Sequence, residues 1–363
     1  MRSPARMLRP SERLRPRDLS PVTPQERFRR LIAREGAISV ARYMGESNAL
    51  YYASRDPLGA AGDFVTAPDI HQMFGELVGA WIADLWVRAG RPPTAYVELG
   101  PGRGTLARDA LRVLSKAGWD GEVHFVEGSP VLRKAQARQV GRAQFHEDPS
   151  RLPDDVALIV IANEFLDALA VRQWVRTPDG WRERMVALDE DRFVFAAGSQ
   201  PMDAVVPPHL REAAPGTILE TSPASVVLVD AVARRVAHQG GAALFIDYGH
   251  LAPRKGSTLQ AVRDHAKVDP LAFPGEADLT AHVDFPALAG VARAAGAGWL
   301  SATTQGAWLT ALGIGERARQ LAAAGDDAAQ AGLNRLVQAD AMGDLFKVMA
   351  FGSRNWPPGA GFA

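Results

Sequence analysis

The fold of this chain is constrained most by short apolar runs that alternate with helical segments from residue 95 onward. The run at 156–162 is apolar throughout, which is typical of a strand covered on both faces. Alternation of this kind predicts an α/β fold with a doubly wound, largely parallel sheet. We predict strands at 95–99, 123–127, 143–146, 156–162, 242–247 and 345–351, and helices at 105–117, from 130 onward and at 223–238.

With 363 residues the chain exceeds the usual size of one compact domain, so additions to this sheet are expected. Short strand-like segments around the turn Pro178-Asp179-Gly180 predict an inserted lobe that is mostly β with some helix. We expect a disordered arm at 1–23, an N-terminal helical and lid segment at 24–90, the first half of the core at 91–169, the inserted lobe at 170–222, the second half of the core with helical additions at 223–352, and a tail at 353–363.

The composition excludes several classes of function. Lys plus Arg equals Asp plus Glu, 41 against 41, so no overall charge favours nucleic acid. No apolar run approaches the roughly 20 residues of a membrane span. The absence of cysteine excludes disulfides and thiolate sites, and no His, Asp and Glu spacing predicts a metal site. We expect a reducing compartment, the cytoplasm, with the mitochondrial matrix as the alternative because the arginine-rich N-terminus faintly resembles a transit peptide.

A glycine-rich loop joins the first predicted strand to the first helix of the alternation. Gly100, Gly102 and Gly104 allow a sharp turn and close approach of a ligand, and the helix N-terminus attracts negative charge. These features suit either a dinucleotide pyrophosphate or the carboxylate of S-adenosylmethionine. A dinucleotide fingerprint requires glycine where this chain has Thr105. Glu98 at the strand end suits the ammonium group of S-adenosylmethionine and not a pyrophosphate.

Glu127 ends the second predicted strand, where an acidic residue that binds ribose hydroxyls is expected in both kinds of site. It therefore supports a nucleoside cofactor but does not distinguish a dinucleotide from S-adenosylmethionine. We assign Glu98, Glu127 and the loop from Gly100 to Thr105 to the cofactor site.

After the fourth strand the chain continues as Asn163-Glu164-Phe165-Leu166-Asp167. Ligands bind outside the carboxyl ends of strands in such sheets, so an acceptor is expected here. Amino-methyltransferases that act on bases and glutamine have Asn/Asp-Pro-Pro-aromatic at this place, whereas this chain offers carboxylates, which suit a guanidinium. We predict Glu164 and Asp167 as acceptor-binding residues and Asn163 as a cofactor contact. The alternative is that both acids only stabilise a helix N-terminus.

Three further segments are candidates for the site. Asp247 ends another strand and is predicted to contact cofactor or acceptor, and residues 62–64 to form a lid. His282 is the histidine predicted to accept a proton. A hydrogen-bonded structural histidine is an equally good interpretation of His282.

Taken together, these motifs resemble the MidA-like family, which includes a mitochondrial complex I assembly factor that methylates a protein arginine. The matching motifs span nearly the whole chain: GAAGDFVTAP (59–68), FGE (74–76), ELGPGRGTL (98–106), VEGSP (126–130), ANEFLDAL (162–169), IDYG (246–249), DLTAHVDF (278–285) and MGDLFK (342–347). Two residues depart from the family pattern, Gly128 and Ala170, and neither has a predicted role.

The resemblance implies a class I methyltransferase fold with a Rossmann-like sheet, S-adenosylmethionine as cofactor and a protein arginine as acceptor. In that family the acceptor lies on the large quinone-side subunit of NADH dehydrogenase, so a respiratory complex I subunit is the expected partner. Two alternatives stay open: an assembly factor that binds S-adenosylmethionine without catalysis, and a nicotinamide-dependent oxidoreductase. The sequence leaves open whether the protein is a monomer or a homodimer.

Overall fold

The central sheet contains the six predicted strands and two that were not predicted, at Val283–Asp284 and Trp299–Thr304. The computed structural model describes residues 22–54 and 65–362. Seven strands lie in the order β15-β16-β10-β5-β2-β3-β4, and β14 pairs with β10. Strands from β10 to β4 are parallel, whereas β16 is antiparallel to its neighbours. Their bounds are β2 Thr94–Leu99, β3 Val123–Val126, β4 Ala143–His146, β5 Ala157–Asn163, β10 Gly241–His250, β14 Val283–Asp284, β15 Trp299–Thr304 and β16 Phe346–Gly352. The predicted doubly wound α/β fold is confirmed.

The order of the strands reverses between β2 and β5. The chain runs outward from β2 through β3 to β4 and then returns to β5 on the opposite side of β2. The connections on either side of such a reversal diverge, which leaves a crevice at the carboxyl ends of the two strands. This topology places the predicted glycine loop after β2 next to the acidic segment after β5.

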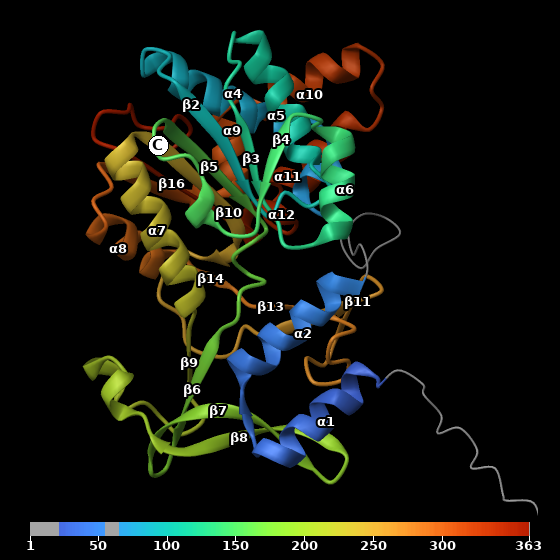
Figure 1. The fold of residues 1–363 in the computed structure, drawn as a ribbon, viewed down its shortest axis with the longest axis vertical. Coiled ribbons are helices and arrows are strands. Elements are labelled where there is room, and N and C mark those ends of the chain that lie inside the picture. The colour runs from blue at the N-terminus through green and yellow to red at the C-terminus, as the bar shows by residue number, and fades with distance from the viewer. Residues whose placement is uncertain (1–21, 55–64, 363) are drawn as a thin grey trace, which may run out of the picture.

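Helices cover both faces of the sheet (Figure 1). One face is packed against α4, α5 and α9 to α12, and the other against α7 and α8. Their bounds are α4 Met73–Arg88, α5 Thr105–Lys116, α6 Pro130–Gln139, α7 Pro223–Gln239, α8 Phe285–Ala294, α9 Gln305–Ala311, α10 Ile314–Ala323, α11 Ala329–Val337 and α12 Met342–Leu345, with short 3-10 turns at Pro149–Arg151, Asp203–Val205 and Pro208–Leu210.

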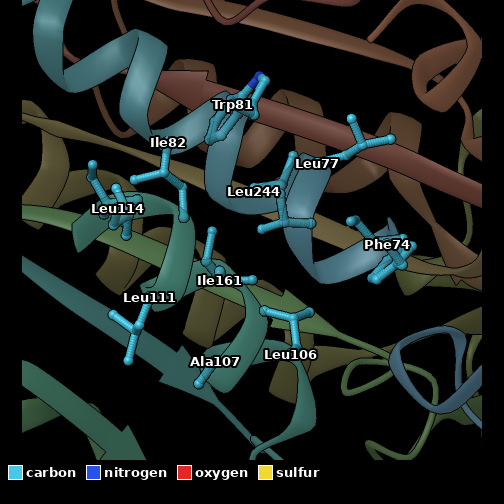
Figure 2. Packing of buried hydrophobic residues seen from close by; sticks show 14 of the residues in the cluster. Phe74, Leu77, Trp81, Ile82, Leu106, Ala107, Leu111, Leu114, Ile161 and Leu244 are labelled. Atoms are coloured by element: carbon cyan, nitrogen blue, oxygen red, sulfur yellow. The ribbon is translucent and has the colours of Figure 1, made fainter. Parts of the chain in front are cut away.

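Helix α4 presents a stripe of apolar side chains to α5 and the sheet. Figure 2 shows Phe74, Leu77 and Trp81 of this stripe lying near Leu244 on the sheet. Each such side chain stabilises the fold by roughly 1.5–3 kcal/mol when it leaves water. Within the segment predicted to be helical at 24–90, α4 is separated from the short helix α3 (Ala67–Ile70), because the backbone is extended at His71.

A second, antiparallel sheet lies at the other end of the molecule from the helices of the core (Figure 1). Its strands follow the order β1-β7-β6-β9, and β8 pairs with β7. Helix α2 lies between this sheet and the central sheet, and a three-stranded sheet, β12-β11-β13, lies beside it. The bounds are α1 Pro24–Glu35, β1 Ile38–Ser39, α2 Val40–Ser54, β6 Arg172–Thr177, β7 Gly180–Asp189, β8 Arg192–Pro201, β9 Ile218–Thr221, β11 Gln260–Arg263, β12 Ala266–Val268 and β13 Asp278–Thr280.

The three predicted strands of the inserted lobe correspond to β6, β7 and β8. Two further strands were not predicted: β9 and the two-residue β1, which joins β7 from the N-terminal part of the chain. Among the described residues, no helix has the length and apolar character needed to cross a membrane. The predicted lid at 62–64 and most of the predicted arm at 1–23 lie outside the described residues.

Candidate active site

The glycine loop after β2 adopts the turn that its sequence predicts. Gly100, Gly102 and Gly104 have φ angles of 61°, 54° and 83°, in the left-handed region that favours glycine. A Cβ on Gly100 would lie 2.4 Å from a ring carbon of Phe165, so the two loops can pack this closely only with glycine there. Helix α5 begins at Thr105, and no described side chain caps its N-terminus. Its first N–H groups therefore remain available to an anionic ligand group.

A cavity of about 510 Å³ lies at the carboxyl ends of β2 and β5. This volume falls within the range of small-molecule sites in proteins. Seven of the predicted site residues line it: Glu98, Gly100, Gly102, Thr105, Glu127, Asn163 and Glu164. Gly104, Asp167, Asp247 and His282 do not. Topology alone thus brings together residues from three separate predicted motifs.

Glu98 is buried at the end of β2 and lines the cavity. The Tyr96 hydroxyl donates a hydrogen bond of 2.6 Å to one of its carboxylate oxygens. Burial raises the pKa of Glu98 to about 7, against the opposing effect of this hydrogen bond. A cationic ligand group beside Glu98 would favour its ionised form.

Glu127 is held in place by two donors. The backbone N–H of Ser129 lies 2.7 Å from one carboxylate oxygen, and the Gln136 side-chain amide lies 3.0 Å from the other. The same amide nitrogen donates to the carbonyl of Gly102 at 2.7 Å. Burial raises the pKa of Glu127, and these hydrogen bonds oppose the shift. Gln136 therefore fixes the acidic end of β3 relative to the glycine loop.

The segment after β5 has an unusual backbone conformation. Glu164 has a φ of 51°, which is uncommon for a residue with a side chain, and its N–H donates to the carbonyl of Ile246. The Glu164 carboxylate accepts from the N–H of Ala67 at 2.7 Å and from the Asn163 amide at 3.1 Å. Burial, then the charge of Asp247, raises the pKa of Glu164 to about 8.

Asn163 presents a polar atom that lacks a partner within the described part of the chain. Its side-chain oxygen is shielded from solvent and accepts no hydrogen bond there. Buried acceptors are rarely left unsatisfied in proteins. Because Asn163 lines the cavity, a ligand N–H is the expected donor.

Asp247 lies behind the acidic segment and not on the cavity wall. One of its carboxylate oxygens accepts from the backbone N–H groups of Phe165, Leu166 and Asp167 at 3.0, 2.7 and 3.4 Å. Burial raises the pKa of Asp247 to about 7, and these hydrogen bonds oppose the shift. Its visible contacts therefore hold the loop after β5, whereas its predicted contact with a cofactor stays a prediction.

Asp167 is surrounded by other acids. Burial, followed by the charges of Asp247, Asp278 and Glu164, raises its pKa well above the usual range. Its backbone carbonyl accepts from the N–H of Ala281, which ties this loop to the segment after β13. Asp167 is thus adjacent to the cavity, within a cluster of carboxyl groups.

His282 lies in a second pocket, of about 140 Å³, between the N-terminal ends of α7 and α8. Its ring packs edge-on against Tyr248 at 4.1 Å, and the Arg254 guanidinium lies 3.5 Å from its Nδ1. Burial, then the charge of Arg254, lowers the pKa of His282 to about 4. The predicted role as proton acceptor stays a prediction, with the residue placed outside the main cavity.

Several cavity residues were not predicted. Asp69 accepts from the hydroxyls of Thr105 at 2.9 Å and Thr66 at 3.2 Å, and so joins α3 to the glycine loop. Asn48 and Tyr52, from α2, form another wall. None of these residues follows a strand of the central sheet, so their positions in the sequence do not mark them as site residues. Among the described residues, no group of three or more His, Asp and Glu side chains is arranged to hold a metal ion.

We expect the free energy of unfolding of the ligand-free protein to fall as pH rises from about 5 to 8. Glu98, Asp247 and Glu164 have folded pKa values of about 7, 7 and 8, above the ordinary values of 4.5 for Glu and 3.8 for Asp. Between the unfolded and folded pKa values, unfolding releases a proton that the folded carboxyl group retains. Each such group therefore costs about 1.4 kcal/mol of stability per pH unit in this window.

Urea denaturation at pH 5.5 and 7.0 measures this effect. Glu98→Gln keeps an acceptor for Tyr96 and removes one titrating group. In the variant, the slope of the unfolding free energy against pH should become shallower by up to the contribution of one titrating group. The difference between the two proteins therefore measures Glu98 separately from all other groups. An unchanged slope in the variant would show that Glu98 is already ionised in this pH range.

Comparisons with known proteins extend over most of the chain. Residues 77–303 match a family described as "Putative S-adenosyl-L-methionine-dependent methyltransferase". The chain is 36% identical to the mitochondrial protein arginine methyltransferase NDUFAF7 of Xenopus tropicalis, with 90% of this chain and 86% of the relative covered. It is also 36% identical to NDUFAF7 of Homo sapiens, with 83% and 76% covered. A crystal structure of a Burkholderia thailandensis protein bound to S-adenosyl-homocysteine matches with a TM-score of 0.79 and 29% identity, over 93% of each chain.

Proposed function

Because this chain belongs to the MidA-like family of S-adenosyl-L-methionine-dependent methyltransferases, we propose that it methylates an arginine side chain of a partner protein. Membership sets aside the alternative of a nicotinamide-dependent oxidoreductase. The two remaining questions are how the cavity holds the cofactor and which chemical group receives the methyl.

The residues of the cavity fit S-adenosylmethionine. Glu127 would bind the ribose hydroxyls, the N-terminus of α5 would bind the carboxylate, and Glu98 with Asp69 would bind the ammonium group. The unsatisfied oxygen of Asn163 offers a further acceptor for a cofactor N–H. When bound, the cofactor supplies an electrophilic methyl group on a sulfonium centre.

The observation that carries the arginine proposal is the cluster of acids beside this cavity. The charged groups that most affect the pKa of Glu164 and of Asp167 are all carboxylates. Such a cluster is poorly stable with all members ionised, and a cation would relieve the repulsion. A guanidinium suits the site because it stays protonated and binds carboxylates through directed N–H groups.

Glu164 has the central role in the proposed reaction. Its carboxylate would orient the guanidinium and accept the proton that the nitrogen loses as the new N–C bond forms. In the free site the pKa of Glu164 is raised to about 8, and a bound guanidinium would favour the ionised form that can accept this proton. Most of the acceleration would come from alignment and exclusion of water, since methyl transfer is a direct displacement.

Transfer of label from S-adenosyl-[methyl-³H]methionine tests the function. The purified protein is incubated with lysate of cells that lack its gene, and the labelled band is hydrolysed and examined for methylarginines. Labelled methylarginine is the expected result. Cofactor binding without any transfer would favour the non-catalytic assembly factor, and label on lysine or glutamine would overturn the arginine proposal.

The curated relatives are named as mitochondrial arginine methyltransferases. On this basis, and on the resemblance to a complex I assembly family, we propose a subunit of NADH dehydrogenase as the acceptor protein. Mass spectrometry of the isolated respiratory complex, with and without the gene for this chain, checks the assignment. A methylarginine that persists without the gene would exclude that site as the product.

Glu127→Ala should weaken S-adenosylmethionine binding at least tenfold. The change removes two charge-assisted hydrogen bonds to ribose, each worth roughly 1.5–3 kcal/mol before water compensates. It also leaves the Gln136 amide without one of its acceptors. Isothermal titration calorimetry measures the Kd, with Glu122→Ala, which changes an exposed acid immediately before β3, as the control. An unchanged Kd would place the ribose elsewhere.

A further inference from the structure

Helix α2 forms a wall of the cavity that is distant in sequence from the cofactor motifs. Asn48 and Tyr52 lie one helical turn apart on it, and both line the cavity. The Asn48 amide donates to the carbonyls of Ala168 at 3.0 Å and Leu279 at 2.8 Å, and its oxygen accepts from the N–H of Leu279 at 3.1 Å. Asn48 therefore fixes α2 against both the loop after β5 and strand β13.

Tyr52 is held in a defined position by this arrangement. Its hydroxyl donates to Asp278 at 2.8 Å, and the Ser129 hydroxyl lies 3.4 Å from its backbone carbonyl. Burial, then the charges of Asp278 and Asp167, raises the pKa of Tyr52 well above its usual range. The phenol therefore remains protonated, and after donating to Asp278 its oxygen still has a lone pair for a ligand N–H.

Asp167 connects this wall with Glu164. The charges of Glu164 and of Asp278, the partner of Tyr52, both raise the pKa of Asp167. The cavity thus offers acceptors on two separate segments: the Glu164 carboxylate after β5, and the Tyr52 hydroxyl of α2, which is hydrogen-bonded to Asp278 of β13.

A guanidinium and an ammonium differ in how they can use two such sets. The guanidinium carries five N–H donors on three nitrogens in a plane, so two nitrogens can bind opposite walls while a terminal nitrogen faces the methyl donor. An ammonium has all its donors on the one nitrogen that must also react. We propose that the Tyr52 hydroxyl, held by its hydrogen bond to Asp278, is a second contact for the guanidinium and makes the site selective for arginine over lysine. This inference rests on the proposed function and adds the residues that determine acceptor specificity.

Two small cations, N-ethylguanidinium and n-butylammonium, probe this selectivity directly. Each is titrated at pH 8 into the full-length protein saturated with S-adenosyl-homocysteine, and the Kd is measured by calorimetry or NMR. We expect the unmodified protein to bind N-ethylguanidinium at least fivefold more tightly. Tyr52→Phe should weaken N-ethylguanidinium at least fivefold and n-butylammonium less than twofold, while the Kd for S-adenosyl-homocysteine changes less than twofold.

Tyr43→Phe is the matched control, because it removes another buried hydroxyl of α2 whose hydrogen bond, to the carbonyl of Pro270, lies outside the cavity. It should change neither Kd. Equal affinity of the unmodified protein for the two cations would overturn the proposal even if Tyr52→Phe did not fold. Guanidinium binding that depends on Glu164 and not on Tyr52 would overturn this inference alone, leaving arginine methylation supported. Failure of arginine labelling would instead count against the proposed function.

Discussion

Replacing Glu164 by glutamine should reduce turnover on the arginine acceptor at least a hundredfold, with S-adenosylmethionine affinity nearly unchanged. A hundredfold loss corresponds to roughly 2.7 kcal/mol of transition-state stabilisation. Glutamine keeps the size of the side chain and an oxygen for the N–H of Ala67, but lacks the negative charge and the capacity to accept a proton. The variant therefore separates the proposed chemistry from the structural role of the same side chain. Initial rates of label transfer and calorimetry with the cofactor measure the two effects.

Glu190→Gln is a suitable control for this experiment. Glu190 also has a left-handed backbone, with a φ of 52°, and it lies exposed in the turn between β7 and β8. Its substitution should alter neither turnover nor affinity. If Glu164→Gln loses stability and keeps its turnover per folded molecule, the side chain acts only through its hydrogen bonds at the start of the loop. If affinity for the cofactor falls as much as turnover, Glu164 belongs to the cofactor site.

Gly102→Val should abolish detectable binding of S-adenosylmethionine. Gly102 lines the cavity with a φ of 54°, so a branched side chain there is strained and projects into the region assigned to the cofactor. Loss of activity follows from loss of cofactor, while the fold stays largely intact. Calorimetry at the highest attainable cofactor concentration gives a lower limit for the Kd.

Gly118→Val isolates the effect of backbone strain. Gly118 has a φ of 87° at the end of α5, and a Cβ there would meet no atom within 4 Å. This variant should lose stability to a similar extent and retain normal cofactor affinity. Retained affinity in a folded Gly102→Val protein would locate the cofactor away from the glycine loop.

The sequence determined the parts of the molecule whose causes are local. Continuous apolar runs form most of β5 and the first half of β10, because a strand covered on both faces has no polar side to present. The loop from Gly100 to Gly104 required glycine for its left-handed backbone, and the acids at its flanks could be assigned from their positions at strand ends. The helix predicted from 130 onward begins at Pro130, with the Ser129 hydroxyl accepting from the N–H of Leu132.

Other features depended on contacts between distant segments. Tyr52 meets Asp278 across 226 positions, and Asn48 meets Leu279 across 231, and no periodicity or local motif encodes either pair. The two-residue β1 is too short to be recognised without its partner β7. The same limitation applied to Asp247, since a strand end shows that a carboxylate lies near the crevice but not which way it faces.

Sequence thus determined the succession of strands along the chain, the glycine loop and the family to which the chain belongs. Only the tertiary structure decided that Asp247 binds three backbone N–H groups behind the loop, that His282 lies in a separate pocket, and that α2 forms a wall of the cavity. The physical reason is that local backbone preferences and burial act between neighbours along the chain. The direction of a polar side chain is decided instead by the hydrogen-bond partners that folding brings to it.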